Sequence, residues 1–360
     1  MKIAIIGSRG IPARYGGFEI FAERLAERLP AMGFELEVYC KKELKKYDFS
    51  IPGVKRRFVP CPSYKSIEKL CLSNLAMLRA AFSRVDVILL LGVSGVPFAL
   101  LAKLLGKKII LNPDGIEWKR QKWNSTGRFV LKTLEHIGVR LSRTIVVDSL
   151  AIGEYIKSRY RRDVVYIPYG TDHPEFTEHD WNSVRKRYSL QSGEYYIAVG
   201  RDVPENNFSM IINGFLNSPT RKKLVIVSDL GNSYKNYGGE KRIIFTGPIY
   251  KRAELFALRA NAFAHIHGHS VGGTNPSLLE AIASDNLVFA YDVPFNREVL
   301  EDAGLYFTSS ESLSSLIKSI EEKRDISGFL ESIREHYNKI LKERYNWKLV
   351  AKKYSEILKI

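Results

Sequence analysis

The chain has 360 residues, which is enough for about two domains of 150–200 residues each. Its composition, 45% hydrophobic and 26% charged with only 14 Pro, is typical of a globular α/β protein and excludes a disordered or fibrous chain. The formal net charge of +16 is uneven: residues 1–170 contain 30 Lys and Arg against 15 Asp and Glu, whereas residues 171–360 contain 25 against 24. A basic first half indicates an anionic partner, such as an acidic bilayer, a phosphorylated lipid or a nucleic acid; the alternative is a solvated basic surface.

The three cysteines (Cys40, Cys61 and Cys71) are odd in number and lack metal-ligand spacing, which predicts reduced thiols in a cytosolic protein. No signal peptide is expected, because Met1 and Lys2 lead straight into a predicted strand. The longest uncharged run, residues 87–102, is interrupted by glycine and proline and is shorter than the about 20 residues of a membrane-spanning helix. We therefore expect a strand and a helix there.

Along the first half, apolar runs of strand length alternate with stretches of helical periodicity. This order predicts a parallel, doubly wound sheet whose ligands bind at the carboxyl ends of the strands. The predicted strands are Lys2–Ile6, Glu35–Cys40, Asp86–Leu91, Lys108–Leu111, Thr144–Val147 and Val164–Ile167, and the predicted helices are Phe18–Met32, Ile67–Phe82, Phe98–Leu105, Phe129–Leu141 and Ile152–Arg159.

A long glycine loop, residues 7–19, follows the first strand and opens a helix. It does not have the Gly-x-Gly-x-x-Gly spacing of a dinucleotide site, and the second strand ends in Cys40-Lys41-Lys42 where such a site has an acidic residue. The sequence therefore disfavours nicotinamide binding. A loop this long and basic suits an anion or a sugar, or is simply flexible.

Acidic, basic and aromatic side chains crowd into residues 112–120, after the fourth predicted strand. Because α/β sheets keep their sites at strand ends, Asp114 is a candidate base or orienting group. Glu117 and Trp118 are equally compatible with a structural role.

The turn-rich residues 167–174 coincide with the change in charge and predict a hinge between two domains, 1–170 and 171–360. A second alternation follows, and the chain ends in helices, the last of which can pack back on the first domain. The strands predicted for this half are Tyr195–Val199, Leu224–Val227, Ile243–Phe245, Ala262–Ile266, Leu287–Tyr291 and Leu305–Phe307, and the terminal helices are Phe329–Leu341 and Trp347–Leu358.

The segment from His265 to Ser284 has the pattern of a strand end, a glycine turn and a helix start. Gly272 and Gly273 permit close backbone approach, Thr274 or Asn275 can cap the helix, and a helix beginning behind such a turn favours a phosphate. Glu280 lies one turn further along the same helix face, within reach of a hydroxyl beside that phosphate.

Arg201 follows the first strand of the second half, where a guanidinium suits bidentate recognition of a diphosphate. Alone, Arg201 would be read as a surface ion-pair partner. The Gly272–Pro276 turn in the same predicted sheet favours a second anion contact.

These motifs together resemble the family-4 glycosyltransferases of the GT-B fold, over essentially the whole chain. The residues that carry the resemblance are Gly16-Gly17-x-Glu19, Gly200-Arg201, and Pro276 with Glu280. Longer stretches are similar to a bacterial subgroup that includes rhamnosyltransferases of capsule and cell-wall polysaccharide synthesis: Gly7–Pro12, Tyr15–Glu19, Asp114–Arg120 and His267–Glu280.

The resemblance implies two Rossmann-like domains with parallel sheets facing an inter-domain cleft, and retaining, metal-independent transfer of a sugar from a nucleoside diphosphate sugar. It implies no cofactor. The acceptor would be a glycan, by our hypothesis linked to polyprenyl diphosphate, and the protein would act in the cytoplasm, peripherally on an anionic inner membrane face. The implied site residues are Arg201, Asn206, Gly272, Gly273, Thr274 and Asn275 for the donor diphosphate, Glu280 for the ribose, Gly247, Pro248 and Ile249 for the base, Gly16 and Gly17 for the approach from the first domain, and Asp114 near the reacting sugar.

Three positions depart from the broad family pattern. Gly272 stands where the wider family has a Glu, Asn206 stands where it has a Lys beside the diphosphate, and Asp114 stands where a His is often found. Within the narrower subgroup these departures imply a different donor sugar, with L-rhamnose from dTDP-rhamnose as our hypothesis, and they leave the role of Asp114 open.

Alternative interpretations remain open from the sequence. His265, His267 and His269 could be zinc ligands of a hydrolase, but Gly268 argues against a continuous strand through all three. His267 and His269 could instead lie near the donor sugar or be structural. Three other functions are compatible with the sequence. They are a glycosyltransferase with a UDP-sugar donor, a related sugar-nucleotide enzyme such as an epimerase and, remotely, a basic nucleic-acid-binding protein, although the chain has no recognisable nucleic-acid-binding motif.

Overall fold

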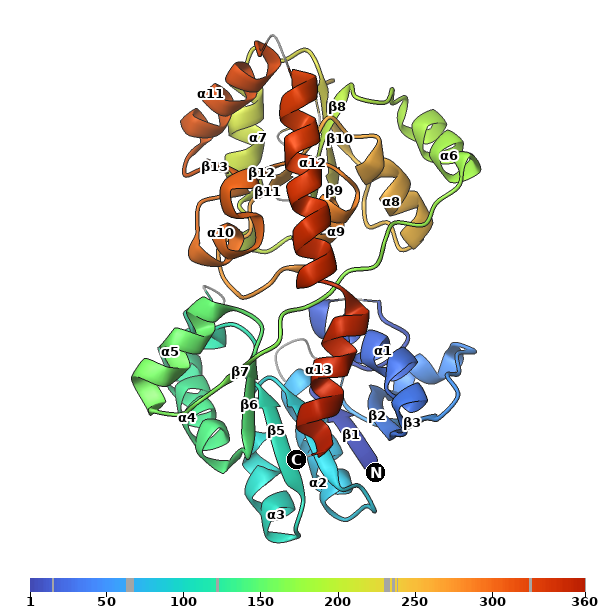
Figure 1. Cartoon of the computed structure of the whole chain (residues 1–360), viewed down its shortest axis with the longest axis vertical. Helices are drawn as coiled ribbons and strands as arrows, with labels where there is room; N and C mark the ends of the chain where they lie inside the picture. The colour runs from blue at the N-terminus through green and yellow to red at the C-terminus, as the bar shows by residue number, and fades with distance from the viewer. Residues whose placement is uncertain are drawn as a thin grey trace. The chain divides into compact units, whose positions relative to one another are not determined.

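A computed structural model describes residues 1–14, 16–62, 68–120, 123–229, 234, 237, 239–323 and 326–359. The chain divides into two compact units (Figure 1). The first contains residues 1–169 together with 347–360, and the second contains residues 170–346. The last helix therefore belongs to the first unit, although it follows the second in sequence.

The first unit is built on a seven-stranded sheet in the order β3-β2-β1-β4-β5-β6-β7, with every pairing parallel. The chain builds outward from β1 on one side and then restarts beside β1 with β4, so the topological switch lies between β1 and β4. The strands are β1 (Lys2–Ile6), β2 (Glu35–Lys41), β3 (Val54–Val59), β4 (Val87–Leu91), β5 (Lys108–Asn112), β6 (Thr144–Val147) and β7 (Val165–Tyr166).

Helices cover both faces of this sheet, as its apolar residues on both faces require. Ala4, Ile6 and Leu90 contribute to a core shared with α2 to α5, whereas α1 packs against α13, and Phe21 of α1 contacts Trp347 and Tyr354 of α13. The helices of the first unit are α1 (Gly17–Arg28), α2 (Glu68–Ala81), α3 (Ala99–Leu104), α4 (Ser125–Leu141), α5 (Leu150–Tyr160) and α13 (Trp347–Lys359).

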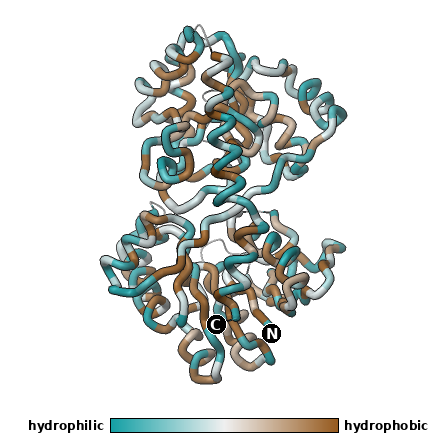
Figure 2. The backbone as a smooth tube through the Cα atoms, in the orientation of Figure 1, coloured by the Kyte–Doolittle hydropathy of each residue, from teal (hydrophilic) through white to brown (hydrophobic). Residues whose placement is uncertain are grey.

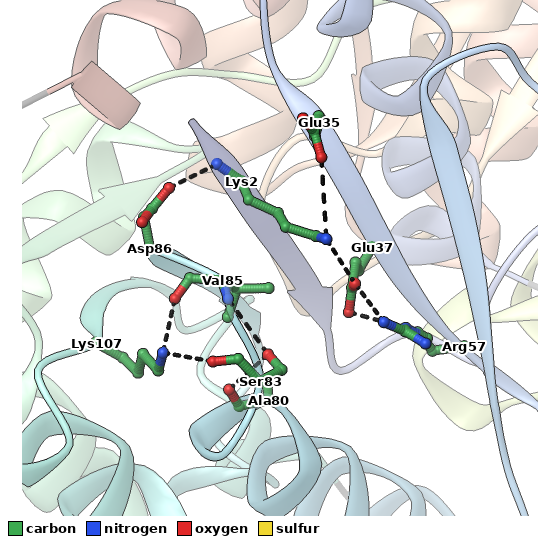
Figure 3. A network of polar contacts seen from close by, with 9 residues as sticks. All are labelled: Lys2, Glu35, Glu37, Arg57, Ala80, Ser83, Val85, Asp86 and Lys107. Atoms are coloured by element: carbon green, nitrogen blue, oxygen red, sulfur yellow. Dashed lines mark hydrogen bonds and ion pairs between the residues drawn. The ribbon is translucent and has the colours of Figure 1, made fainter.

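The edge strand β3 was not among the predicted strands. Three consecutive cations, Lys55 to Arg57, hide its alternation, and one of them neutralises a buried acid (Figure 3). Arg57 Nη2 donates to Glu37 Oε1 at 2.6 Å, and Lys2 Nζ lies 3.2 Å from the same oxygen. Burial alone would raise the pKa of Glu37, but the hydrogen bonds from Arg57 and Lys2 outweigh it and hold that pKa below its usual value.

The second unit contains a six-stranded sheet in the order β10-β9-β8-β11-β12-β13, again parallel throughout, with its switch between β8 and β11. The predicted strands of this half are confirmed to within two residues. They are β8 (Tyr195–Val199), β9 (Lys223–Val227), β10 (Ile243–Phe245), β11 (Ala264–His267), β12 (Leu287–Tyr291) and β13 (Leu305–Phe307), and the helices are α6 (Glu178–Tyr188), α7 (Phe208–Leu216), α8 (Arg252–Ala260), α9 (Pro276–Ala283), α10 (Pro294–Leu300), α11 (Ser310–Glu321) and α12 (Ile326–Glu343).

The hydropathy of the backbone follows this architecture: the strands of the first unit are predominantly apolar, whereas α12 is mixed along its length (Figure 2). Strands buried on both faces read as continuous apolar runs, as in the sequence of β4, Val-Ile-Leu-Leu-Leu. Among the described residues, no helix is long and apolar enough to cross a membrane.

Candidate functional site

In each unit, the predicted site residues follow the carboxyl ends of strands, and most of them lie in loops that border the switch point; Asp114 after β5 and Gly247–Ile249 after β10 lie further along the sheets. In the first unit the loops after β1 and β4 meet at the switch point: a Cβ on Gly7, which has φ +107°, would lie 1.9 Å from the Leu91 carbonyl oxygen. Only glycine permits this approach. In the second unit the loops after β8 and β11 lie at the switch point of the sheet.

The glycine loop of the first unit is held by acidic side chains of α1. Glu19 Oε1 accepts a hydrogen bond from the Arg9 N–H at 2.8 Å, and Glu23 Oε2 accepts one from the Ala13 N–H at 2.7 Å. Gly16 is the extended N-cap residue of α1 and Gly17 its first residue, so both lie at the positive end of a helix, while Tyr15 lies outside the described residues.

Asp114 follows β5 in a left-handed conformation, with φ +70°. Its N–H donates to Asn112 Oδ1 at 3.0 Å, and its carboxylate lies 3.7 Å from Arg120 Nη2. Arg120 also pairs with Glu117 at 2.8 Å, so Glu117 is engaged within its own turn, and Trp118 Nε1 donates to Tyr155 at 3.2 Å.

The buried hydroxyl of Tyr169 interacts electrostatically with several acids, Asp114 among them. Burial raises the pKa of the Tyr169 hydroxyl well above its usual value, and the negative charges of Asp148, Asp114 and Glu19 raise it further. Asp148, buried at the end of β6, is an acid that the sequence analysis missed, although its position directly after a strand could have indicated it.

In the second unit, hydrogen bonds join the loops after β8 and β11. Ser270 N donates to the Glu205 carbonyl at 2.8 Å, and Asn207 Nδ2 donates to the Gly268 carbonyl at 2.7 Å. Gly268 must be glycine for this contact, because a Cβ would lie 2.3 Å from the Asn206 carbonyl oxygen. The two loops therefore form one rigid structure at the switch point.

Asn206, predicted to face the diphosphate, is the centre of this junction. Its Nδ2 donates to the Arg201 carbonyl at 2.7 Å, and its Oδ1 lies 2.8 Å from His269 Nδ1. Since Oδ1 can only accept, His269 carries its proton on Nδ1 in this pair. Asn206 thus orients the backbone of Arg201 and the ring of His269, and its diphosphate contact stays a prediction.

The predicted glycine turn leads into α9, as expected. Gly272 has φ +150°, and Asn275 is the N-cap residue, its Oδ1 accepting a hydrogen bond from the Ser277 N–H at 2.9 Å. Pro276 is the first helical residue and needs no N–H partner. Within the described part of the chain, the N–H groups of Gly272 and Gly273 make no hydrogen bond, and Thr274 is buried beside them.

Glu280 is fixed by a buried arginine that the sequence analysis did not identify. Arg259 of α8 has a side chain only 1% exposed; its Nη1 donates to Glu280 Oε2 at 2.6 Å and its Nη2 to Ser277 Oγ at 3.0 Å. Ser277 Oγ donates in turn to the Val199 carbonyl at the end of β8. No sequence motif marks Arg259, because its role depends on the packing of α8 against α9.

The remaining predicted residues are distributed around the same sheet edge. Arg201 is exposed directly after β8, and Gly247 to Ile249 follow β10, where Gly247 has φ +70°. The sheet order places β10 two strands away from β8.

Two of the three histidines considered as zinc ligands lie on β11. His265 and His267 lie on one strand face with ring centroids 6.0 Å apart, and both are buried. Burial holds the pKa of each ring well below its usual value, so both are neutral at pH 7. Among the described residues no group of three or more His, Cys, Asp and Glu side chains could hold a metal ion.

Comparisons with known proteins bear on the fold. Residues 1–172, just under half of the chain, match a family described as a domain of unknown function, DUF1972. No curated protein matches the sequence. Sucrose-phosphate synthase from Thermosynechococcus elongatus is structurally similar with a TM-score of 0.81 at 16% identity, covering 99% of this chain and 98% of that one.

Two further solved structures are similar over their whole length. HepE from Anabaena in complex with UDP has a TM-score of 0.76 at 16% identity, with 100% of both chains covered. The catalytic domain of starch synthase IV from Arabidopsis thaliana, bound to ADP and acarbose, has a TM-score of 0.73 at 13% identity, with 98% of each chain covered. These likenesses and the two parallel sheets confirm the predicted fold class, which is α/β of the GT-B type.

Proposed function

We propose that this protein is a glycosyltransferase that moves a sugar from a nucleoside diphosphate donor to a glycan acceptor, without a metal and with retention of configuration. The donor would bind in the second unit at the carboxyl ends of β8 and β11. The observation that carries the proposal is the turn before α9, where the N–H groups of Gly272 and Gly273 make no hydrogen bond within the described residues.

The N–H groups of Gly272 and Gly273 are hydrogen-bond donors that suit a diphosphate. The side chain of Asn275 already accepts a hydrogen bond from the Ser277 N–H at the start of α9. The N–H groups left for an anion are therefore those of the turn, and the positive end of the α9 dipole lies behind them. Arg201 adds a full positive charge on the neighbouring loop. In sugar transfer the diphosphate is the leaving group, and fixed positive groups lower the barrier by stabilising the charge that develops on it.

Glu280 supplies the second element of donor recognition. Arg259 holds one carboxylate oxygen, and the side chain stays 16% exposed, so Glu280 can accept hydrogen bonds from a ribose diol. The solved structure of HepE in complex with UDP-glucose shows that a protein of this fold takes such a donor. His269, oriented by Asn206, is the candidate polar group for the sugar.

The finer assignments follow from the sequence resemblance. We propose L-rhamnose from dTDP-rhamnose as the donor, a polyprenyl-diphosphate-linked saccharide as the acceptor, and action on the inner face of a bacterial membrane in surface polysaccharide synthesis. Asp114, among the acids near Tyr169, is the candidate group on the acceptor side.

Calorimetric titration with dTDP- and UDP-sugars, in Mg²⁺ and again in EDTA, tests the donor assignment. Binding of dTDP-rhamnose that survives EDTA is the expected result. Preference for a UDP-sugar would retain the reaction class and discard rhamnose, and conversion of the donor without transfer to any glycan would favour an epimerase. Failure of every sugar nucleotide to bind contradicts the proposal.

Two variants test the site. Arg201→Ala should weaken donor binding about 10- to 150-fold, the value of a charge-assisted hydrogen bond of roughly 1.5–3 kcal/mol. Glu280→Gln is preferable to Glu280→Ala, since the amide oxygen retains a partner for the buried Arg259. Arg185→Ala, an exposed arginine of α6, is the matched control and should bind donor as the wild type does.

A further inference from the structure

One surface of the first unit exposes apolar side chains on two neighbouring helices. On α3, Leu104 is 75% and Leu100 52% exposed, and on α4, Phe129 is 71% exposed, with Val130 and Ile137 also exposed. Among the described residues, Tyr250 is the only exposed large apolar side chain outside the first unit. An apolar group of this kind marks a binding surface more often than chance exposure.

The exposed residues of these two neighbouring helices are here called the α3–α4 face, and the helices meet near the C-terminal end of α4. They pack against each other, and Lys103 Nζ of α3 donates to the Leu141 carbonyl at the end of α4 at 3.0 Å. Gly138 permits the close approach of α4, because a Cβ there would lie 2.8 Å from Val96 Cγ2 in the turn before α3. The exposed residues are therefore held in place by a packed interior.

The charge on and around this face has one sign. Residues 96–112 and 125–143 contain seven Lys and Arg and a single acid, Glu135. Glu135 is buried and accepts hydrogen bonds from Tyr155 and Tyr160, so it does not offset the exposed cations. Lys103, Arg128 and Arg140 are exposed on the same two helices as the apolar side chains.

Other basic clusters of the first unit are partly used within the protein. Arg57 pairs with the buried Glu37, and Arg56 donates to the carbonyls of Leu44 and Tyr47. Lys41 pairs with Glu68 at 2.8 Å. Arg57, Arg56 and Lys41 thus stabilise the fold, whereas Arg128 and Arg140 are exposed on the helix that carries Phe129.

We infer that the α3–α4 face is the surface through which the protein lies on an anionic lipid bilayer. Leu100, Leu104 and Phe129 enter the boundary between headgroups and acyl chains, and the surrounding Lys and Arg contact lipid phosphates while their aliphatic stems remain with the apolar groups. The inferred membrane contact rests on the proposed function, because a lipid-linked acceptor requires a membrane. Vesicle binding can nevertheless be measured without any turnover.

The test is flotation of the whole chain with vesicles of phosphatidylcholine alone or of phosphatidylcholine with phosphatidylglycerol. We expect the wild type to float with the anionic vesicles. The double variant Leu104→Glu/Phe129→Glu should reduce vesicle affinity at least about 100-fold, because each side chain buried in lipid contributes about tenfold or more. Arg128→Gln/Arg140→Gln should weaken binding to the anionic vesicles and reduce its sensitivity to salt.

Matched controls carry the same charge changes on exposed positions of the second unit. Tyr250→Glu/Ser315→Glu and Arg185→Gln/Lys186→Gln should float as the wild type does. Unchanged flotation of Leu104→Glu/Phe129→Glu overturns the inference, as does a wild type that ignores anionic vesicles. So does a wild-type dimer, seen by light scattering, that this variant converts to a monomer, since the face would then join two copies.

Donor titration separates this inference from the proposed function. If the wild type binds a sugar nucleotide but does not float, only the inferred membrane face is contradicted. If it floats through the α3–α4 face but binds no sugar nucleotide, the membrane face stands and the proposed reaction is contradicted. Circular dichroism checks that each variant is folded, which we expect for exposed positions.

Discussion

Arg259 illustrates how much of the proposed donor site depends on one residue outside it. The guanidinium is buried, and Glu280 and Ser277 are two of its hydrogen-bond partners. Arg259→Met should lower the free energy of unfolding by about 3 kcal/mol, because it leaves the Glu280 carboxylate without its partner. It should also weaken donor binding, since Glu280 is no longer held in place.

A double-mutant cycle shows whether Arg259 acts through Glu280. In a Glu280→Gln background, Arg259→Met should have little further effect on the donor Kd measured by calorimetry. An equal loss of affinity in both backgrounds would assign Arg259 an independent role. Arg187→Met, which removes an exposed arginine paired with Glu254, is the control and should leave donor affinity unchanged.

His265 makes the stability of the second unit depend on pH. Its pKa is lowered well below the usual value by burial first, and then by the positive charge of Arg259 and by unfavourable coupling to the neighbouring His267. A proton therefore binds the unfolded chain more readily than the folded one, and stability falls as pH drops below about 6.5, by about 1.4 kcal/mol per pH unit for each such histidine. His267 contributes in the same sense.

His265→Leu should reduce this pH dependence. Neither ring nitrogen of His265 has a hydrogen-bond partner among the described residues, so the substitution should cost little stability above neutral pH. Urea unfolding at pH values above and below the histidine pKa measures both effects. An unchanged slope of stability against pH in the variant would contradict the assignment.

Among the secondary-structure elements, α9 connects stability with the proposed donor binding through its N-cap residue. Asn275→Ala removes the hydrogen bond to the Ser277 N–H and should cost about 1 kcal/mol of stability. Asn275→Asp keeps the cap but adds a negative charge beside the proposed diphosphate, so it should preserve the melting temperature and weaken donor binding. Unchanged donor binding in Asn275→Asp would show that the turn does not hold an anion.

For the whole molecule, the decisive feature is the return of the chain to the first unit. Trp347 of α13 is buried against Phe21 and Tyr169, with ring centroids 6.2 and 6.4 Å away. Trp347→Ala should lower the free energy of unfolding of the first unit by about 3–5 kcal/mol through the cavity it creates. Phe21 and Tyr169 would each lose one aromatic partner.

Calorimetry with and without a sugar nucleotide can assign the affected unit. A ligand bound in the second unit stabilises that unit, so its transition should move up on addition of donor. Trp347→Ala should lower the other transition. If the substitution instead shifted only the donor-sensitive transition, the grouping of α13 with the first unit would be wrong.

Much of the fold was predictable because both sheets are buried on two faces. Continuous apolar runs such as Val87–Leu91 indicate strands irrespective of their neighbours, and the alternation with helices implies parallel order. β3 escaped prediction because an edge strand can carry cations that neutralise a buried acid from the adjacent strand, as Arg57 does for Glu37. That pairing depends on register, which the sequence does not state.

The sequence by itself determined the alternation of strands and helices in two parallel sheets, the glycine turn before α9 and the excess of positive charge in the first half, because each depends on local chemistry or on composition. The GT-B type followed from the family resemblance, and the structure chose Asn275 over Thr274 as the capping residue. Only the tertiary structure decided how those residues are used. It placed Arg259 against Glu280, joined Asn206 to His269, returned α13 to the first unit, and gathered Leu104 and Phe129 on one basic surface. These arrangements bring together residues distant in the chain, and packing between elements, which no local pattern encodes, is their physical cause.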